Sequence, residues 1–154
     1  MRLQNLLLAA TLTIAPAIIP AFANDKTAVM AAVQQFDAGF NKGDMKTATG
    51  ACAPDPIIID DFPPHVWQGA NACADWWNAY TAAAKADVIT DPIVAIGKPH
   101  RVDVTGDRAY VVLYPKYTYK MAGKPVVENG STWTMALQKT GTIWRITGWA
   151  WGQH

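Results

Sequence analysis

The chain has 154 residues, of which 51% are hydrophobic and 16% are charged, with 13 basic against 12 acidic side chains. This composition is typical of a single globular domain and excludes a disordered chain. Because the charges nearly balance and no block of basic residues occurs, the sequence argues against binding to nucleic acid or to an anionic membrane surface.

The first 23 residues have the pattern of a secretory signal: Arg2, an apolar stretch, and the small-x-small triplet Ala21-Phe22-Ala23. Pro16 and Pro20 divide the apolar stretch into pieces shorter than the roughly 20 residues that a membrane-spanning helix needs. We therefore predict cleavage after Ala23, export to the periplasm or medium, and a mature domain over residues 24–154. The alternative is a retained membrane anchor.

Cys52 and Cys73 are the only two cysteines. In an oxidising compartment they have a single intramolecular pairing, which would close a loop of about 20 residues and add roughly 3 kcal/mol of stability. The disulfide is favoured over two buried free thiols. A zinc site is not expected, because two cysteines without a nearby histidine supply too few ligands.

Helical spacing dominates the first part of the mature chain. Residues 26–40 carry large apolar side chains at steps of four, three and four, which places them on one stripe of a helix: Val29, Val33, Phe36 and Phe40. Gly43 is suited to end this helix, and Asp44 can cap a short second helix over residues 45–51.

A buried strand and a third helix are expected next. The strand covers residues 57–59 and runs into residues 60–67, where Pro63 and Pro64 favour a stiff, non-helical loop. The third helix spans about residues 69–86. Its expected stripe consists of Cys73, Trp77, Tyr80 and Ala84, with Trp76 beside it.

The second part of the chain has long β-type segments divided by glycine turns. Four strands are predicted, over residues 93–104, 108–121, 125–138 and 143–151. Short turns between neighbours imply antiparallel pairing. Apolar residues alternate with polar ones along the second strand, so one face of the sheet is covered and the other is wet.

The helix ending in Asn41-Lys42-Gly43-Asp44, the short strand ending in acids, the third helix and the four-stranded meander closing on residues 144–149 together resemble the nuclear transport factor 2-like superfamily, and within it the SnoaL-like proteins. The resemblance covers nearly all of residues 25–152. It implies an α+β cone-shaped half-barrel, with three N-terminal helices packed on a curved antiparallel sheet of four long strands plus one short strand, and an apolar pocket between them. Steroid isomerases, dehydratases, polyketide cyclases and proteins without any chemistry share this fold, so the fold alone assigns no reaction.

The acids after the short strand are the most site-like residues. Family isomerases and cyclases carry their acid-base carboxylate at the position that Asp61 matches, and only one of Asp60 and Asp61 can enter the pocket, because neighbouring strand residues face opposite sides. A carboxylate desolvated among aromatic rings would have a raised pKa, as a general base needs, and His65 could assist it. In the alternative, Asp60, Asp61 and His65 only fix the proline-rich loop through hydrogen bonds.

Two departures separate this chain from the family's steroid isomerases. Their oxyanion-stabilising tyrosine on the first helix corresponds to Phe36, which has no hydrogen-bond donor. Their second acid, from a late strand, should fall near residues 131–134, none of which is acidic. Steroid isomerisation by that set of residues is therefore not expected, although tyrosines elsewhere offer other donors.

Seven tryptophans are available to fill the core or to line a cavity. Trp133 is a candidate for the cavity because Asn129 and Ser131, on the same alternating face, are polar where a packed core would prefer aliphatic groups. The predicted ligand-binding residues are Trp67, Trp76, Tyr117, Tyr119, Asn129, Ser131 and Trp133.

The sequence therefore predicts an exported protein with an apolar pocket that binds or transforms a small apolar or cyclic carbonyl compound by acid-base chemistry. The alternative is a non-catalytic module of the same fold that holds a ligand or a protein. We expect no metal or other cofactor, no nucleic-acid partner and no membrane association after cleavage. We also expect a homodimer that pairs through the outer face of the sheet.

Overall fold

The computed structural model of the protein describes residues 21–153. The predicted signal therefore lies almost entirely outside the described residues, and cleavage after Ala23 would fall in the first turn of a helix that begins at Ala21. Within residues 21–153, no helix combines the length and apolar character needed to cross a membrane.

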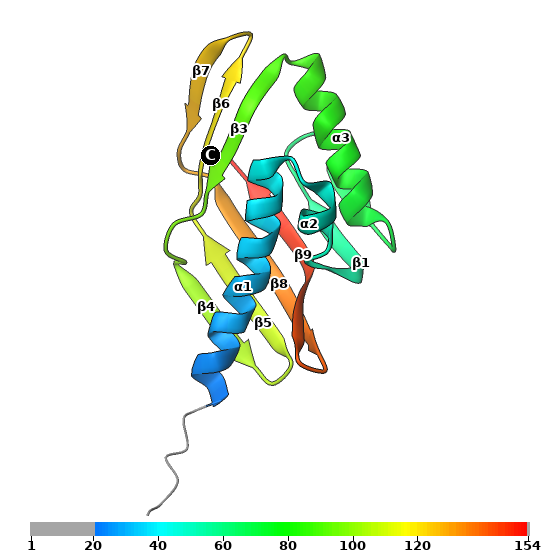
Figure 1. The fold of residues 1–154 in the computed structure, drawn as a ribbon, viewed down its shortest axis with the longest axis vertical. Coiled ribbons are helices and arrows are strands. Elements are labelled where there is room, and N and C mark those ends of the chain that lie inside the picture. Colours follow the sequence, from blue (N-terminus) through cyan, green and yellow to red (C-terminus); the bar gives the residue numbers. More distant parts are fainter. Residues whose placement is uncertain (1–20, 154) are drawn as a thin grey trace, which may run out of the picture.

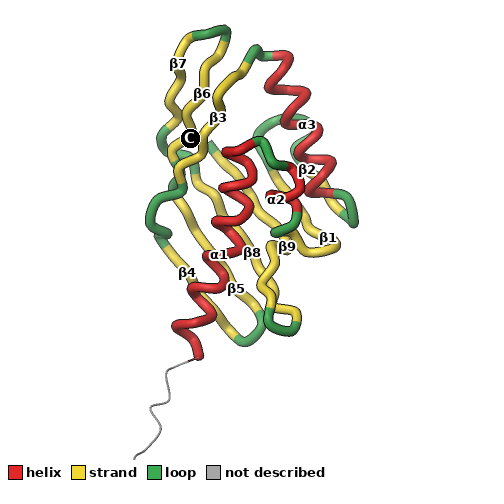
Figure 2. The backbone as a smooth tube through the Cα atoms, viewed as in Figure 1, coloured by secondary structure: helices red, strands yellow, loops and turns green. Residues whose placement is uncertain are grey.

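Three helices precede most of the strands, as Figure 2 shows. The elements in chain order are α1 (Ala21–Lys42), α2 (Met45–Thr49), β1 (Cys52–Ile59), β2 (Val66–Gln68), α3 (Ala72–Ala86), β3 (Ile89–Ala95), β4 (Arg101–Thr105), β5 (Arg108–Leu113), β6 (Lys116–Met121), β7 (Lys124–Glu128), β8 (Thr132–Thr140) and β9 (Ile143–Gly152). The expected α+β half-barrel is confirmed, with α1 lying across one face of a curved sheet (Figure 1).

The first helix follows its predicted stripe. Val29, Val33, Phe36 and Phe40 are all buried, so the period of the apolar residues sets which face of α1 meets the sheet. The helix ends before Gly43, whose φ of 67° is left-handed. Asp44 then caps α2 by accepting a hydrogen bond from the Thr47 amide at 3.1 Å.

Three of the four predicted long strands are each divided in two. The chain forms a six-stranded sheet in the order β2-β1-β9-β8-β5-β4 and a separate three-stranded sheet in the order β3-β6-β7. The breaks fall at Gly97 and Pro99, at Pro115 and at Gly130, because proline cannot donate a ladder hydrogen bond and glycine permits sharp bends. The three-stranded sheet lies at the upper end of the molecule, with β3 on the side of α3 (Figure 1).

The sheet is mixed, which corrects the expectation of purely antiparallel pairing. β1 is longer than the predicted residues 57–59 and pairs with β9 in parallel, with Ile58 opposite Trp149. Gly148 allows this close approach, since a Cβ there would lie 2.5 Å from the Ile57 carbonyl oxygen. The loop after β1 is non-helical as predicted, and it returns as β2, which pairs antiparallel with β1.

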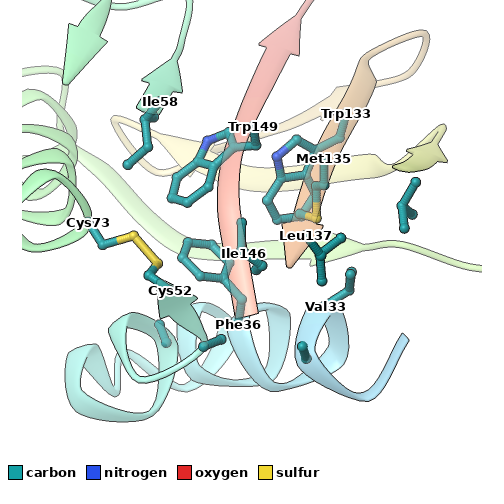
Figure 3. Packing of buried hydrophobic residues seen from close by; sticks show 14 of the residues in the cluster. Val33, Phe36, Cys52, Ile58, Cys73, Trp133, Met135, Leu137, Ile146 and Trp149 are labelled. Carbon is teal, nitrogen blue, oxygen red and sulfur yellow. A yellow bond between two sulfur atoms is a disulfide. The ribbon is translucent and has the colours of Figure 1, made fainter. Parts of the chain in front are cut away.

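The third helix turns its expected stripe toward the core. Cys73 and the neighbouring Trp76 are buried, and Trp77, Tyr80 and Ala84 are half-buried. The structure contains the predicted disulfide between Cys52 and Cys73, which joins the start of β1 to the first turn of α3. Figure 3 shows this bond beside the core side chains of α1 and β9. It covalently links β1 and α3, the elements on either side of the segment that carries Asp60 and Asp61.

Candidate active site

A cavity of about 220 Å³ lies between α3, the three-stranded sheet, and the ends of β1, β8 and β9. Aromatic residues make up ten of its nineteen lining residues: Phe36, Phe40, Phe62, Trp76, Tyr80, Tyr117, Tyr119, Trp133, Trp149 and Trp151. Phe36 contacts Trp149 with ring centroids 4.8 Å apart. Both rings line the cavity and also belong to the buried core (Figure 3). The cavity is thus an aromatic chamber built by both sheets and two helices.

Asp60 is the polar side chain buried in this chamber. It follows β1 in the same phase as the fully buried Ile58, so it points inward and is only 8% exposed. Its Oδ2 accepts a hydrogen bond from the indole Nε1 of Trp76 at 2.8 Å, and its Oδ1 accepts one from the Asp61 amide at 2.8 Å. Both oxygens are therefore held in place by groups from two different elements.

Burial raises the pKa of the Asp60 carboxyl to about 7. The hydrogen bonds from Trp76 and from the Asp61 amide favour the ionised form and oppose this shift, while the charge of Asp61 adds to it. At neutral pH Asp60 is populated both as an acid and as a carboxylate, which is the condition that a general base or acid requires.

Asp61 and His65 lie differently from what the sequence suggested. Asp61 lines the cavity but is exposed, so the inward position belongs to Asp60. His65 is exposed and absent from the cavity wall, and its Nδ1 lies 3.1 Å from the Asp60 backbone oxygen. The physical reason is the alternation along β1: Ile58 faces the core, Ile59 faces outward, and Asp60 is again inward.

A pair of tyrosines provides hydroxyl groups in the same wall. The hydroxyls of Tyr80 on α3 and Tyr117 on β6 are hydrogen-bonded at 2.8 Å. Burial raises the pKa of both phenols, so both are neutral at pH 7. Since one hydroxyl donates to the other, the accepting tyrosine keeps a proton that it can donate to a bound molecule.

A second polar pair also lines the cavity. The Tyr119 hydroxyl donates to Glu128 Oε1 at 2.6 Å, and Gln153 Nε2 donates to the other oxygen of Glu128. The hydrogen bond to Glu128 and burial raise the pKa of Tyr119 to about 12. The Tyr119 hydroxyl and both oxygens of Glu128 are therefore already hydrogen-bonded within the protein.

The predicted ligand-binding residues divide into two groups. Those in the cavity wall are Trp76, Tyr117, Tyr119 and Trp133. Those outside it are Trp67, which packs on Phe62 with ring centroids 5.0 Å apart, the exposed Asn129, and Ser131, which is 1% exposed. The Ser131 Oγ and Trp133 Nε1 are buried and have no hydrogen-bond partner among residues 21–153.

Sequence reasoning missed Tyr80, Asp87 and Glu128 as cavity residues. Tyr80 was assigned to a helix stripe, and no local pattern links it to Tyr117, 37 residues further along the chain. Glu128 ends β7, which was hidden inside a predicted long strand. Within the described part of the chain, no group of three or more His, Cys, Asp or Glu is arranged to hold a metal ion.

The family model of the SnoaL-like domain matches residues 29–150. A protein of unknown function from Mycobacterium tuberculosis superposes with a TM-score of 0.72 at 17% identity, covering 90% of this chain and 78% of that one. An NTF2-like protein with a cystatin-like fold from Novosphingobium aromaticivorans has a TM-score of 0.71 at 16% identity, with coverages of 86% and 84%.

A hexachlorocyclohexane dehydrochlorinase, LinA-type3 from Novosphingobium barchaimii, is also similar in structure. Its TM-score is 0.69 at 13% identity, covering 86% of this chain and 90% of that one. At such identities, the likeness establishes the fold alone. No curated protein matches the chain in sequence.

Proposed function

The chain belongs to the SnoaL-like domain family, and we propose that its aromatic cavity binds a small cyclic carbonyl compound from which Asp60 removes a proton. The observation that carries this proposal is the buried Asp60 carboxyl, held by Trp76 and with a pKa of about 7. The role that the sequence suggested for Asp61 is thus proposed for its neighbour. Tyr80 and Tyr117 are the proposed partners in place of His65, which is not in the cavity wall.

In the proposed reaction, a carboxylate oxygen of Asp60 takes a proton from the carbon next to the carbonyl group. The electron pair of that C–H bond forms an enolate, whose oxygen accepts a hydrogen bond from the free proton of the Tyr80–Tyr117 pair. Asp60 then returns a proton to the same carbon, which exchanges it, or to another carbon, which gives an isomer. Neither outcome needs an oxidant, a reductant or a third reactant.

The size of the cavity supports a ligand with one ring. An apolar cavity of about 150 Å³ is large enough to hold benzene, and the volume here is about 220 Å³. The name of one structural neighbour, a hexachlorocyclohexane dehydrochlorinase, also specifies a compound with a single six-membered ring.

The test is deuterium incorporation into 3-cyclohexen-1-one in D₂O near neutral pH, followed by proton NMR. Its C2 protons are acidified by both the carbonyl group and the double bond. We expect the protein to accelerate exchange over buffer, Asp60→Asn to reduce it at least 100-fold, and the matched variant Asp61→Asn to retain it. Equal exchange with Asp60→Asn and the unaltered protein would reject Asp60 as the base.

A non-catalytic ligand-binding module is the second candidate. It is favoured by Phe36, which lines the cavity at the position of the isomerases' tyrosine but has no donor. It is also favoured by the internal pairing of Tyr119 with Glu128. Tight binding of cyclic ketones without any exchange would select this module over the enzyme.

Export is also proposed, through the signal over residues 1–23. The disulfide between Cys52 and Cys73 supports it, because such bonds persist mainly in oxidising compartments. Amino-terminal sequencing of the protein recovered from outside the cytoplasm should start at Asn24. A start at Met1 would contradict the proposal.

We further propose a homodimer formed through the outer face of the six-stranded sheet. Its support is a group of apolar side chains that point outward and are 43% to 53% exposed: Ile57, Ile59, Val66 and Tyr110. Sedimentation at micromolar concentration should give a dimer for the unaltered protein and a monomer for Ile59→Lys. A monomer for both would remove the proposal.

A further inference from the structure

The charged residues of the cavity all have one sign. Four carboxyl groups line it, from Asp60, Asp61, Asp87 and Glu128, and no Lys, Arg or His among residues 21–153 does so. Asp60 and Asp61 come from the loop that follows β1, Asp87 from the end of α3 and Glu128 from the end of β7. Three segments that are far apart in the sequence therefore bring acids to one cavity.

The fields of these acids overlap inside the cavity. The hydroxyl of Tyr119 has its pKa raised first by the hydrogen bond to Glu128 and by burial, and then by the charges of Glu128, Asp61 and Asp87. The pKa of Tyr80, on α3, is raised first by burial and then by the charges of Asp60 and Glu128. Across the whole chamber, an anion would be repelled and a cation attracted.

The position of Asp87 is not explained by helix stability. Asp87 is the C-cap of α3, where the helix dipole disfavours a negative charge. It is exposed and follows Lys85, which already supplies a basic residue in the last turn. An acid at this point costs helix stability, and what it adds is negative charge at the mouth of the cavity.

The walls suit an organic cation rather than a metal ion. Tryptophan and tyrosine rings have electron-rich faces that attract ammonium groups, and ten of the nineteen lining residues are aromatic. Calcium and magnesium instead need six or more oxygen ligands or retained water. An alkylammonium group has no such need, and its charge can be met by carboxylates and aromatic faces together.

We infer that the ligand of this cavity is a small organic cation, a protonated or quaternary amine on an apolar body. This inference rests on the proposed function only in placing the ligand in the same cavity. It specifies the charge of the ligand, which the acid-base chemistry leaves open. A positive charge near Asp60 would also favour its carboxylate form, which is the form that removes a proton.

The test compares three molecules of nearly equal shape: choline, its neutral carbon analogue 3,3-dimethyl-1-butanol, and the anion 3,3-dimethylbutanoate. Binding to the purified protein is measured by calorimetry and by tryptophan fluorescence. We expect choline to bind at least 10-fold more tightly than the alcohol, and the anion to bind more weakly than both.

Two variants assign the preference to the cavity acids. Asp87→Asn and Glu128→Gln should each reduce the affinity for choline severalfold while leaving that for the alcohol unchanged. Asp55→Asn removes an exposed acid of β1 outside the cavity wall and should change neither. Equal loss of choline affinity in Asp55→Asn would mean that net charge alone is responsible, and would overturn the inference.

Three other outcomes overturn it as well: equal binding of choline and the alcohol, tighter binding of the anion, or binding of none of the three. Deuterium exchange into the neutral ketone is measured independently. A protein that exchanges the ketone through Asp60 but shows no preference for choline would refute the cation and retain the proposed function.

Discussion

Asp25 and Asp60 each accept a hydrogen bond from an indole nitrogen, yet their pKa values move in opposite directions. Asp25, near the start of α1, is bound by Lys139 at 2.6 Å and by Trp144 Nε1 at 3.3 Å, and these hydrogen bonds lower its pKa. Asp60, in the cavity, is bound by Trp76 at 2.8 Å, and burial raises its pKa to about 7.

Two things differ: Asp60 is desolvated by burial, and Asp25 has a cationic partner. Lys139 forms an ion pair with Asp25 and also lies 5.8 Å from the ring centroid of Trp144. The negative charge of Asp25 is therefore balanced by a neighbouring cation. Asp60 lies among aromatic rings with no basic lining residue among those described. An indole hydrogen bond alone orients a carboxyl group without fixing its charge, and an aspartate in such a place is available for proton transfer or for pairing with a cationic ligand.

The largest expected effect is on the pH dependence of stability. The folded-state pKa of Asp60 lies above its ordinary value of 3.8, so its ionisation destabilises the fold progressively between about pH 4 and pH 7. The charge of Asp61 adds to the raised pKa of Asp60, and the charge of Asp60 in turn adds to the raised pKa of Tyr80. Asp60→Asn should lack this loss, and its stability relative to the unaltered protein should rise by up to about 4 kcal/mol from pH 4 to pH 8.

Urea unfolding at both pH values measures this difference. The exposed Asp55→Asn, outside the cavity wall, is the control, and its stability should stay within about 0.5 kcal/mol of the unaltered protein at either pH. A difference between Asp60→Asn and the unaltered protein that does not change with pH would mean that Asp60 is not an uncompensated buried acid.

The second effect concerns how the cavity end is held together. The disulfide joins β1, which precedes Asp60, to α3, which carries Trp76, across a sequence separation of 21. Replacing both cysteines by alanine should cost about 3 kcal/mol, chiefly because the unfolded chain becomes less constrained. Urea unfolding checks the value, and peptide mapping without reduction should recover Cys52 linked to Cys73. Two freely alkylated thiols in the exported protein would contradict the bond.

A smaller effect isolates the indole hydrogen bond at each aspartate. Trp76→Phe removes the donor to Asp60 and should raise the pKa of Asp60 further, because that hydrogen bond favours the carboxylate. Its destabilisation should be about 1 to 2 kcal/mol greater at pH 8 than at pH 5. In Trp144→Phe, Lys139 still binds Asp25, so no comparable difference between the two pH values is expected. Equal pH profiles for the two variants would mean that the indole hydrogen bond has the same effect at Asp25 as at Asp60.

The smallest effect comes from removing the cationic partner of Asp25, so that this aspartate, like Asp60, has no basic neighbour. Lys139→Met removes the cation from Asp25, and the pKa of Asp25 should rise as a result. Carbon NMR titration of the side-chain carboxyl group checks the direction. Stability should change little, because both partners are partly solvated. An unchanged Asp25 pKa would mean that the indole, and not the lysine, sets it.

Local patterns in the sequence were sufficient for much of the fold. The stripe from Val29 to Phe40, the end of α1 before Gly43 and the cap at Asp44 depend on interactions within one or two turns, so their spacing predicts them. The two cysteines allow only one pairing. The broken strands were also signalled, by Gly97, Pro115 and Gly130, but were interpreted as continuous because each segment keeps its β-type residues on both sides of the break.

The candidate site was decided by tertiary structure. Three successive isoleucines precede Asp60, so hydrophobicity cannot tell which alternate positions face inward, and only the parallel pairing of Ile58 with Trp149 settles that Asp60 enters the cavity. The sequence did single out Asp60 and Asp61, both of which line the cavity, and four of its seven predicted ligand-binding residues also lie in the cavity wall.

Tyr80, Asp87 and Glu128 join the site because the three-stranded sheet folds over α3, and residues so far apart in sequence carry no local signal of that meeting. The sequence by itself determined the helices, the turns and the family resemblance, since these follow from neighbours along the chain. The charge and the chemistry of the cavity arise from long-range packing. It buries Asp60 among aromatic rings without a basic partner, whereas it pairs Asp25 with Lys139.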